Sequence, residues 1–210
     1  MQSNQLFRCA GWSAYVNVGA NIIGFVSLVV FFSVGGIAGP INDSSSIFFA
    51  LSLIPLALML HILHRSLFPP ISLVVTTVGV IAMITTATLQ ALLVLNVVQF
   101  EQTLLPVLTA NAVIGGWFIT NGILAHVSNT LPKGLAWWSI IAGAGLVLII
   151  FGFWIGGQEH PLTAIGGLAS FIGILIWTIW LGRLLLAGKV TPPEKNKVRI
   201  LSAVSNKAFK

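Results

Sequence analysis

The chain has 210 residues, of which 57% are hydrophobic and 7% are charged, and its formal net charge is +6. Ordinary soluble domains carry about 25% charged residues, so this composition, with a mean hydropathy of +1.01, excludes that class. The apolar runs are continuous rather than alternating, which also excludes a membrane β-barrel.

Six long apolar segments follow one another with only short connections between them. A helix needs roughly 20 apolar residues to cross the hydrocarbon core of a membrane. The sequence therefore predicts an all-α, polytopic membrane bundle of six transmembrane helices. We expect the helices over residues 10–34, 47–64, 71–98, 107–127, 134–155 and 162–187.

Prolines mark several of the predicted boundaries. Pro106, Pro132 and Pro161 are expected to start the fourth, fifth and sixth helices, because proline is well tolerated in the first turn of a helix. Pro55 falls inside the second segment and predicts a kink there. The bundle is expected to occupy residues 1–188, followed by a basic cytoplasmic tail over residues 189–210.

The charged residues predict how the bundle is oriented. Acidic residues fall in the first, third and fifth connections, whereas basic residues precede the first segment, fall in the second and fourth connections and follow the sixth. The acidic residues are Asp43, Glu101 and Glu159, and the basic ones are Arg8, Arg65, Lys133 and Arg183. Because Lys and Arg are retained on the cytoplasmic side, we expect both termini in the cytoplasm and the protein in the cell inner (plasma) membrane.

Four asparagines within the predicted spans are candidate ligand-binding residues. Asn17 and Asn21 are four residues apart, which places them on one face of the first helix, and Asn111 and Asn121 lie in the fourth. Their common use in membranes is hydrogen bonding between helices, worth about 0.6–2 kcal/mol each. The alternative is that they line a cavity for a polar ligand.

Three histidines are candidate cofactor ligands. His61, His64 and His126 are expected at similar depth near the cytoplasmic ends of the second and fourth helices. A neutral imidazole is an axial ligand of haem and a common metal ligand, so one histidine from each helix could hold a haem if the two helices are neighbours. The alternative is that these side chains extend to the lipid headgroups.

No Asp, Glu, Lys or Arg falls at the middle of a predicted span. Ion-coupled transporters usually keep such a residue inside the membrane, so that class is disfavoured. The sequence also lacks a paired-carboxylate site, a zinc-protease helix motif and a serine-elbow motif. We therefore expect no catalytic residues and no enzyme.

One stretch resembles a known family. Residues 122–143, GILAHVSNTLPKGLAWWSIIAG, contain a turn at Leu131-Pro132-Lys133 and a small pair at Ala142-Gly143. This pattern resembles a bacterial family of multi-pass membrane proteins described only as a domain of unknown function. The resemblance implies a fold of six or seven helices and a bacterial origin, and it implies no activity. His126 stands where that family often has tyrosine.

These observations predict a non-catalytic membrane protein that serves as an accessory or packing subunit of a larger membrane assembly. One alternative is a carrier, or the substrate-capturing component of a transporter, for a small uncharged or lipid-like molecule. A second alternative is a haem- or metal-binding membrane protein that uses the histidines. The expected partners are the lipid bilayer, anionic lipids at the basic tail and other membrane subunits, with no nucleic acid.

Overall fold

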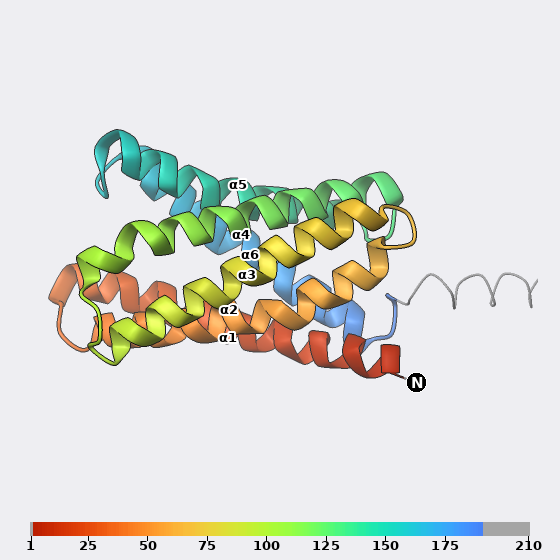
Figure 1. The fold of residues 1–210 in the computed structure, drawn as a ribbon, viewed down its shortest axis with the longest axis horizontal. Helices are drawn as coiled ribbons and strands as arrows, with labels where there is room; N and C mark the ends of the chain where they lie inside the picture. The colour runs from red at the N-terminus through yellow and green to blue at the C-terminus, as the bar shows by residue number, and fades with distance from the viewer. Residues whose placement is uncertain (1, 191–210) are drawn as a thin grey trace, which may run out of the picture.

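The computed structural model describes residues 2–190, and within them it contains six α-helices and no strand. The helices run along the length of an elongated bundle and are joined by short turns (Figure 1). Each of the six is long and apolar enough to cross a membrane. Their bounds are α1 Gln2–Val34, α2 Ala38–His64, α3 Pro69–Val94, α4 Phe100–Ser128, α5 Lys133–Gly156 and α6 Pro161–Leu186.

The six helices form a closed ring. Each packs against the helices that precede and follow it in the chain, and α6 packs back against α1, whereas α2 and α4 touch only slightly. The N-terminus and the end of α6 lie at one end of the bundle, called here the termini end (Figure 1). The opposite end, called the far end, carries the turns at residues 35–37, 95–99 and 157–160. The predicted all-helical architecture, with six helices long and apolar enough to span a membrane, is thus confirmed, and it is compatible with a multi-pass membrane protein.

The start of α2 differs from the prediction, because the helix begins at Ala38 and not at residue 47. Gly35 and Gly36 turn the chain with φ angles of 73° and 70°, a conformation that residues with a Cβ rarely adopt. The polar residues that follow are helical, and the Ser45 hydroxyl donates to the carbonyl of Asn42 at 2.7 Å. Such local bonds satisfy short polar side chains within a helix, so the polar run extends α2 and does not form a loop.

The start of α4 also differs from the prediction. This helix begins at Phe100, so Pro106, expected as its first residue, lies inside it. A capping box explains the earlier start: the backbone N–H of Gln99 donates to the side-chain oxygen of Gln102 at 3.0 Å, and the Gln99 side chain accepts from the backbone in return. Reciprocal caps of this kind satisfy donors that have no partner in the first turn of a helix.

Three further helix boundaries, in α1, α3 and α6, can be compared with the prediction. α1 begins at Gln2, eight residues before the predicted start. α3 ends at Val94 rather than residue 98, because Asn96 adopts a left-handed backbone conformation with φ 56°. Pro161 is the first residue of α6, as predicted.

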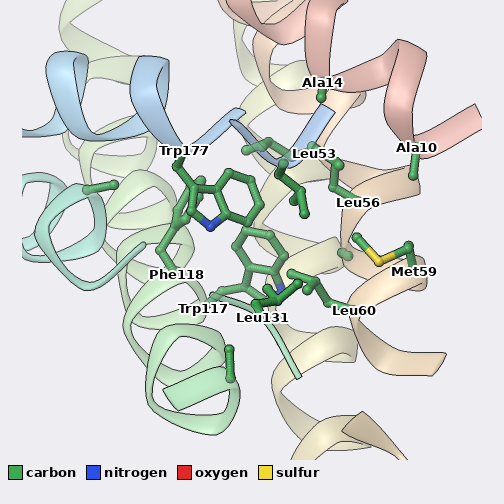
Figure 2. Packing of buried hydrophobic residues seen from close by; sticks show 14 of the residues in the cluster. Ala10, Ala14, Leu53, Leu56, Met59, Leu60, Trp117, Phe118, Leu131 and Trp177 are labelled. Carbon is green, nitrogen blue, oxygen red and sulfur yellow. The ribbon is translucent and has the colours of Figure 1, made fainter. Parts of the chain in front are cut away.

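The core of the bundle is built around three aromatic side chains. Trp177 of α6 lies edge-to-face on Phe118 and Trp117 of α4, with ring centroids 5.0 and 6.2 Å apart (Figure 2). Edge-to-face pairs contribute about 0.5–1.5 kcal/mol beyond the area they bury. Aliphatic side chains of α2 surround these rings, and Leu53, Leu56, Met59 and Leu60 are fully or almost fully buried (Figure 2).

Small residues let α4, α5 and α6 approach closely. A Cβ at Gly143 of α5 would collide with the backbone carbonyl of Gly115 on α4. A Cβ at Gly145 would collide with the backbone N–H of Ser170 on α6, and it would come within 2.7 Å of the carbonyl oxygen of Gly166. Close backbone packing of this kind is typical of helices that associate within lipid, where no hydrophobic drive brings helices together.

Charged residues are divided between the two ends of the bundle, although two of the acidic ones lie in helices and not in loops. Asp43 belongs to α2 and Glu101 to the first turn of α4, whereas Glu159 lies in the turn before α6. All three are toward the far end. The basic residues at the termini end are Arg8, Arg65, Lys133, Arg183 and Lys189. Residues 191–210, which hold most of the tail predicted to bind anionic lipids, lie outside the described residues.

Candidate functional site

A hollow of about 210 Å³ lies in the far-end half of the bundle, lined by residues of α1, α2, α4, α5 and α6. We call it the far-end pocket. Its polar lining consists of amides and hydroxyls, and none of the described residues that line it is charged. The polar residues of the lining are Asn21, Asn42, Ser45, Ser46, Asn111 and Ser170.

Two of these amides are held in place by bonds between helices. The Asn21 side chain on α1 donates to the carbonyl of Phe171 on α6 at 3.3 Å, and the Asn42 side chain on α2 donates to the carbonyl of Gly24 on α1 at 2.9 Å. Both donor groups are thereby engaged with the wall of the pocket. These bonds fix where the two asparagines can present their remaining polar atoms.

Asn111 is different, because its amide oxygen is buried and has no hydrogen-bond partner among the described residues. An unpaired acceptor of this kind costs about 1–3 kcal/mol, and native proteins normally satisfy such groups with protein atoms, water or a ligand. Asn111 also lines the pocket, so its side-chain amide is a candidate contact for a molecule held there. This group is the most informative feature of the site.

Glycines leave space at two points of the lining. Gly24 allows α1 and α2 to approach, because a Cβ there would come within 2.7 Å of the Ser45 hydroxyl. Gly167 of α6 faces open space, with no atom within 4 Å of where its Cβ would lie. A larger side chain can therefore be added to the pocket lining at Gly167 without displacing a neighbour.

Asn17 and Asn121, the other two candidate asparagines, are hydrogen-bonded within the bundle and do not line the pocket. Asn17 is fully buried, and its amide donates to the carbonyl of Phe49 and to the hydroxyl of Ser52, both at 2.9 Å. It therefore bonds α1 to α2, as the interhelical interpretation predicts. Asn121 instead donates to the carbonyl of Trp117 within its own helix at 2.9 Å. Of the four predicted residues, only Asn21 and Asn111 line the far-end pocket.

We expect Asn17→Leu to lower the free energy of unfolding by about 1 kcal/mol, because it removes bonds between α1 and α2 inside the bundle. Unfolding in mild detergent would be followed by circular dichroism. A double-mutant cycle with Ser52→Ala isolates the bond between the two side chains. Thr109→Leu is the control, since Thr109 is exposed and bonds only to its own helix. Equal effects of Asn17→Leu and Thr109→Leu would contradict a linking role for Asn17.

The three histidines lie near the termini end and have three different sets of neighbours. The His61 ring is hydrogen-bonded to the hydroxyl of Ser72 on α3, with 3.0 Å between Nδ1 and Oγ. His64 is fully buried, and its Nε2 lies 3.1 Å from the hydroxyl of Thr130 in the α4–α5 turn. The ring of His126 packs edge-to-face on a tryptophan of α5, with a centroid distance of 5.8 Å.

In the ring order α3 packs against both α2 and α4, and the helices that carry His64 and His126 contact each other only slightly. Within residues 2–190, no group of three or more His, Cys, Asp or Glu side chains is arranged to hold a metal ion. The haem interpretation stays a prediction with no added geometric support.

We expect the purified protein to show no Soret band, because the His61 and His64 rings are each engaged with a hydroxyl group and face different neighbours. An absorption spectrum of protein expressed with added haem precursor would measure this. A Soret band that disappears in the double variant His61→Ala/His64→Ala, and persists in His160→Ala, would show that the expectation is wrong.

Sequence reasoning missed four polar residues of the far-end pocket. Asn42, Ser45 and Ser46 were assigned to a loop, although their spacing of three and four places them on one face if the segment is helical. Ser170 falls inside the sixth predicted helix, where a single serine gives no signal of a binding site. The sequence signal that could have identified Asn42, Ser45 and Ser46 is their helical spacing directly before an apolar segment.

Comparison of the chain with protein-family models, with curated proteins and with solved structures gives no match. Functional inference for this chain therefore depends on the geometry of the bundle and its pocket.

Proposed function

We propose that this is a non-catalytic, multi-pass protein of the cell inner membrane that binds a small uncharged molecule in the far-end pocket, as a carrier or as the substrate-capturing component of a transporter. The observation that carries the proposal is a hollow lined by amides and hydroxyls, one of which, the Asn111 amide, has a buried oxygen without a hydrogen-bond partner among the described residues. Convergent polar groups in a largely apolar cavity are typical of small-molecule sites.

The lining favours an uncharged ligand. No charged side chain is present among its described residues, and a charge buried in the membrane interior without a partner costs at least about 2.5 kcal/mol. The ligand must nevertheless be polar, because it has to donate a hydrogen bond to Asn111. A volume of about 210 Å³ equals the space of roughly seven water molecules in the liquid, so the bound group is small.

The orientation follows from the charges. With the basic residues in the cytoplasm, the termini end is the inner end and the pocket lies in the outer half of the membrane. The ligand would then be captured from the outer side. A bacterial origin agrees with the resemblance carried by residues 122–143 and belongs to the same proposal.

An accessory role in a larger assembly remains the alternative prediction. Large apolar side chains are exposed on all six helices, and lipid or a partner subunit can cover such surfaces equally well. By contrast, contact with lipid does not require the amides and hydroxyls that line the pocket. We therefore place ligand binding first.

Native mass spectrometry of protein extracted in mild detergent tests the proposal. We expect an additional small-molecule mass on the unmodified protein and on Gly116→Leu, because Gly116 lines no part of the pocket and faces open space. The mass should be absent from Gly167→Leu, which fills the pocket, and from Asn111→Leu, which removes the acceptor. No additional mass on the unmodified protein, or the same mass on all four proteins, would overturn the proposal.

A further inference from the structure

A second hollow lies beside the far-end pocket, on the outside of α1 and α2. Its volume is about 570 Å³, and we call it the α1–α2 groove. Apart from two serines, its lining is apolar or glycine. The lining residues are Val16, Gly19, Ala20, Ile23, Ile37, Pro40, Ile41, Ser44, Ser45 and Phe48.

The groove faces the surroundings of the bundle. Val16, Ile23 and Phe48 are more than half exposed, at 52%, 53% and 61%. These residues belong to candidate membrane spans, and the exposed side chains of a membrane span face lipid. The medium that reaches the groove is therefore hydrocarbon rather than water.

The groove and the pocket meet at two small residues. Ala20 of α1 and Ser45 of α2 line both hollows and are buried, so the lipid-facing groove and the polar pocket share part of one wall, where α1 and α2 pack together. A molecule that lies in the groove can place a polar end at the pocket only by parting α1 and α2 at these two side chains. The apolar groove alone could be filled by any lipid chain; its junction with a polar pocket is what selects a particular occupant.

We propose that the two hollows together hold one uncharged, single-chain amphiphile, which enters from the lipid between α1 and α2 and places its hydroxyl- or amide-bearing head at Asn111 and its chain in the groove. This inference rests on the proposed function, and it names the class of ligand. The groove has room for roughly 19 water-sized groups at about 30 Å³ each, which is comparable to the number of carbons in a long acyl chain.

The groove and the pocket contribute differently to binding, because the groove is in contact with lipid. A chain in the groove exchanges contacts with lipid tails for similar contacts with side chains, so it adds little affinity of its own. Its effect is to keep the head next to the pocket, which raises the effective concentration of the head. The hydrogen bond to Asn111 supplies selectivity, and a charged phosphate head is disfavoured because no charged side chain of the described lining compensates it.

The probe is 1-mono-oleoylglycerol, an uncharged amphiphile with two hydroxyl donors, and the measurement is its half-saturating concentration by native mass spectrometry. Gly19→Leu narrows the groove and Gly167→Leu fills the pocket, and in both cases no atom lies within 4 Å of the added Cβ. Gly116→Leu makes the same change on α4, away from both hollows. Glycerol, which is the head alone, is the second probe.

We expect one bound probe molecule and a loss of about tenfold or more with either Gly19→Leu or Gly167→Leu, while Gly116→Leu stays within about twofold of the unmodified protein. Glycerol should bind far more weakly. If Gly167→Leu still abolishes the co-purified mass but the probe fails to bind, or binds equally to Gly19→Leu, the amphiphile inference is overturned and the pocket proposal stands. If Gly167→Leu alters neither the co-purified mass nor probe binding, both are overturned.

Discussion

Replacing Gly145 with alanine is expected to lower the free energy of unfolding by about 2–3 kcal/mol, which is the upper part of the range for overpacked interiors. The added Cβ would collide with the backbone N–H of Ser170 and lie 2.7 Å from the carbonyl oxygen of Gly166. Both obstacles belong to the backbone of α6, so no side chain can rotate away, and α5 and α6 must separate. The ring would then lose one of its closest helix pairs.

Gly116→Ala is the matched control for this change. A Cβ there meets nothing within 4 Å, and alanine is preferred over glycine in a helix by about 0.8–1.0 kcal/mol. We therefore expect the control to be neutral or slightly stabilising, opposite in sign to Gly145→Ala. Denaturation in mixed micelles followed by circular dichroism would measure both. Equal stability of the two variants would contradict the close packing of α5 on α6.

Trp177→Ala is expected to have a similarly large effect, about 3 kcal/mol, at the lower end of what truncating a buried aromatic costs. Trp177 is 1% exposed and packs on Trp117 and Phe118, so its removal leaves a cavity where α2, α4 and α6 meet. We expect the lower end of this range because a chain embedded in lipid gains little free energy when an apolar side chain moves from lipid into the protein core.

Trp154→Ala serves as the comparison, because Trp154 is 63% exposed and its truncation leaves no internal cavity. Its expected effect is within about 0.5 kcal/mol. Unfolding midpoints and the near-ultraviolet circular dichroism of the aromatic cluster would be compared for the two variants. A Trp177→Ala protein as stable as Trp154→Ala would mean that the ring is not closed around this cluster.

The number of helices and their order could be predicted from the sequence, because apolar length alone decides which segments cross a membrane. The starts of α2 and α4 at the far end could not. Asn42 and Ser45 indicate a loop when only polarity is considered, yet their side chains bond to α1 and to their own helix. The spacing of three residues between Gln99 and Gln102 is compatible with a capping box, but in the sequence alone Pro106 is the stronger signal for a helix start.

The candidate site, like the helix boundaries, could be predicted from the sequence only in part. Asn21 and Asn111 were found because an amide inside a span needs a partner, but whether that partner is another helix or a ligand depends on which helices are neighbours. The histidines illustrate this most clearly: their depth follows from the sequence, while the hydroxyl of Thr130 beside His64 depends on the tertiary arrangement. Helix neighbours are set by small-residue contacts such as that between Gly143 and Gly115, and a single sequence does not reveal which small residues meet.

The most direct test of the central claim, a polar pocket at Asn111 inside a membrane bundle, is the thiol reactivity of Asn111→Cys. The only natural cysteine, Cys9, is first replaced in Cys9→Ser, and the protein is treated in liposomes with a small membrane-permeant methanethiosulfonate. Gly116→Cys, five residues further along α4 and so on a different face of the helix, is the reference. Because only the solvated thiolate reacts, we predict that Asn111→Cys is modified about tenfold or more faster than Gly116→Cys, and that 1-mono-oleoylglycerol slows its modification. Equal and slow modification at both positions would contradict the pocket and, with it, the proposed function.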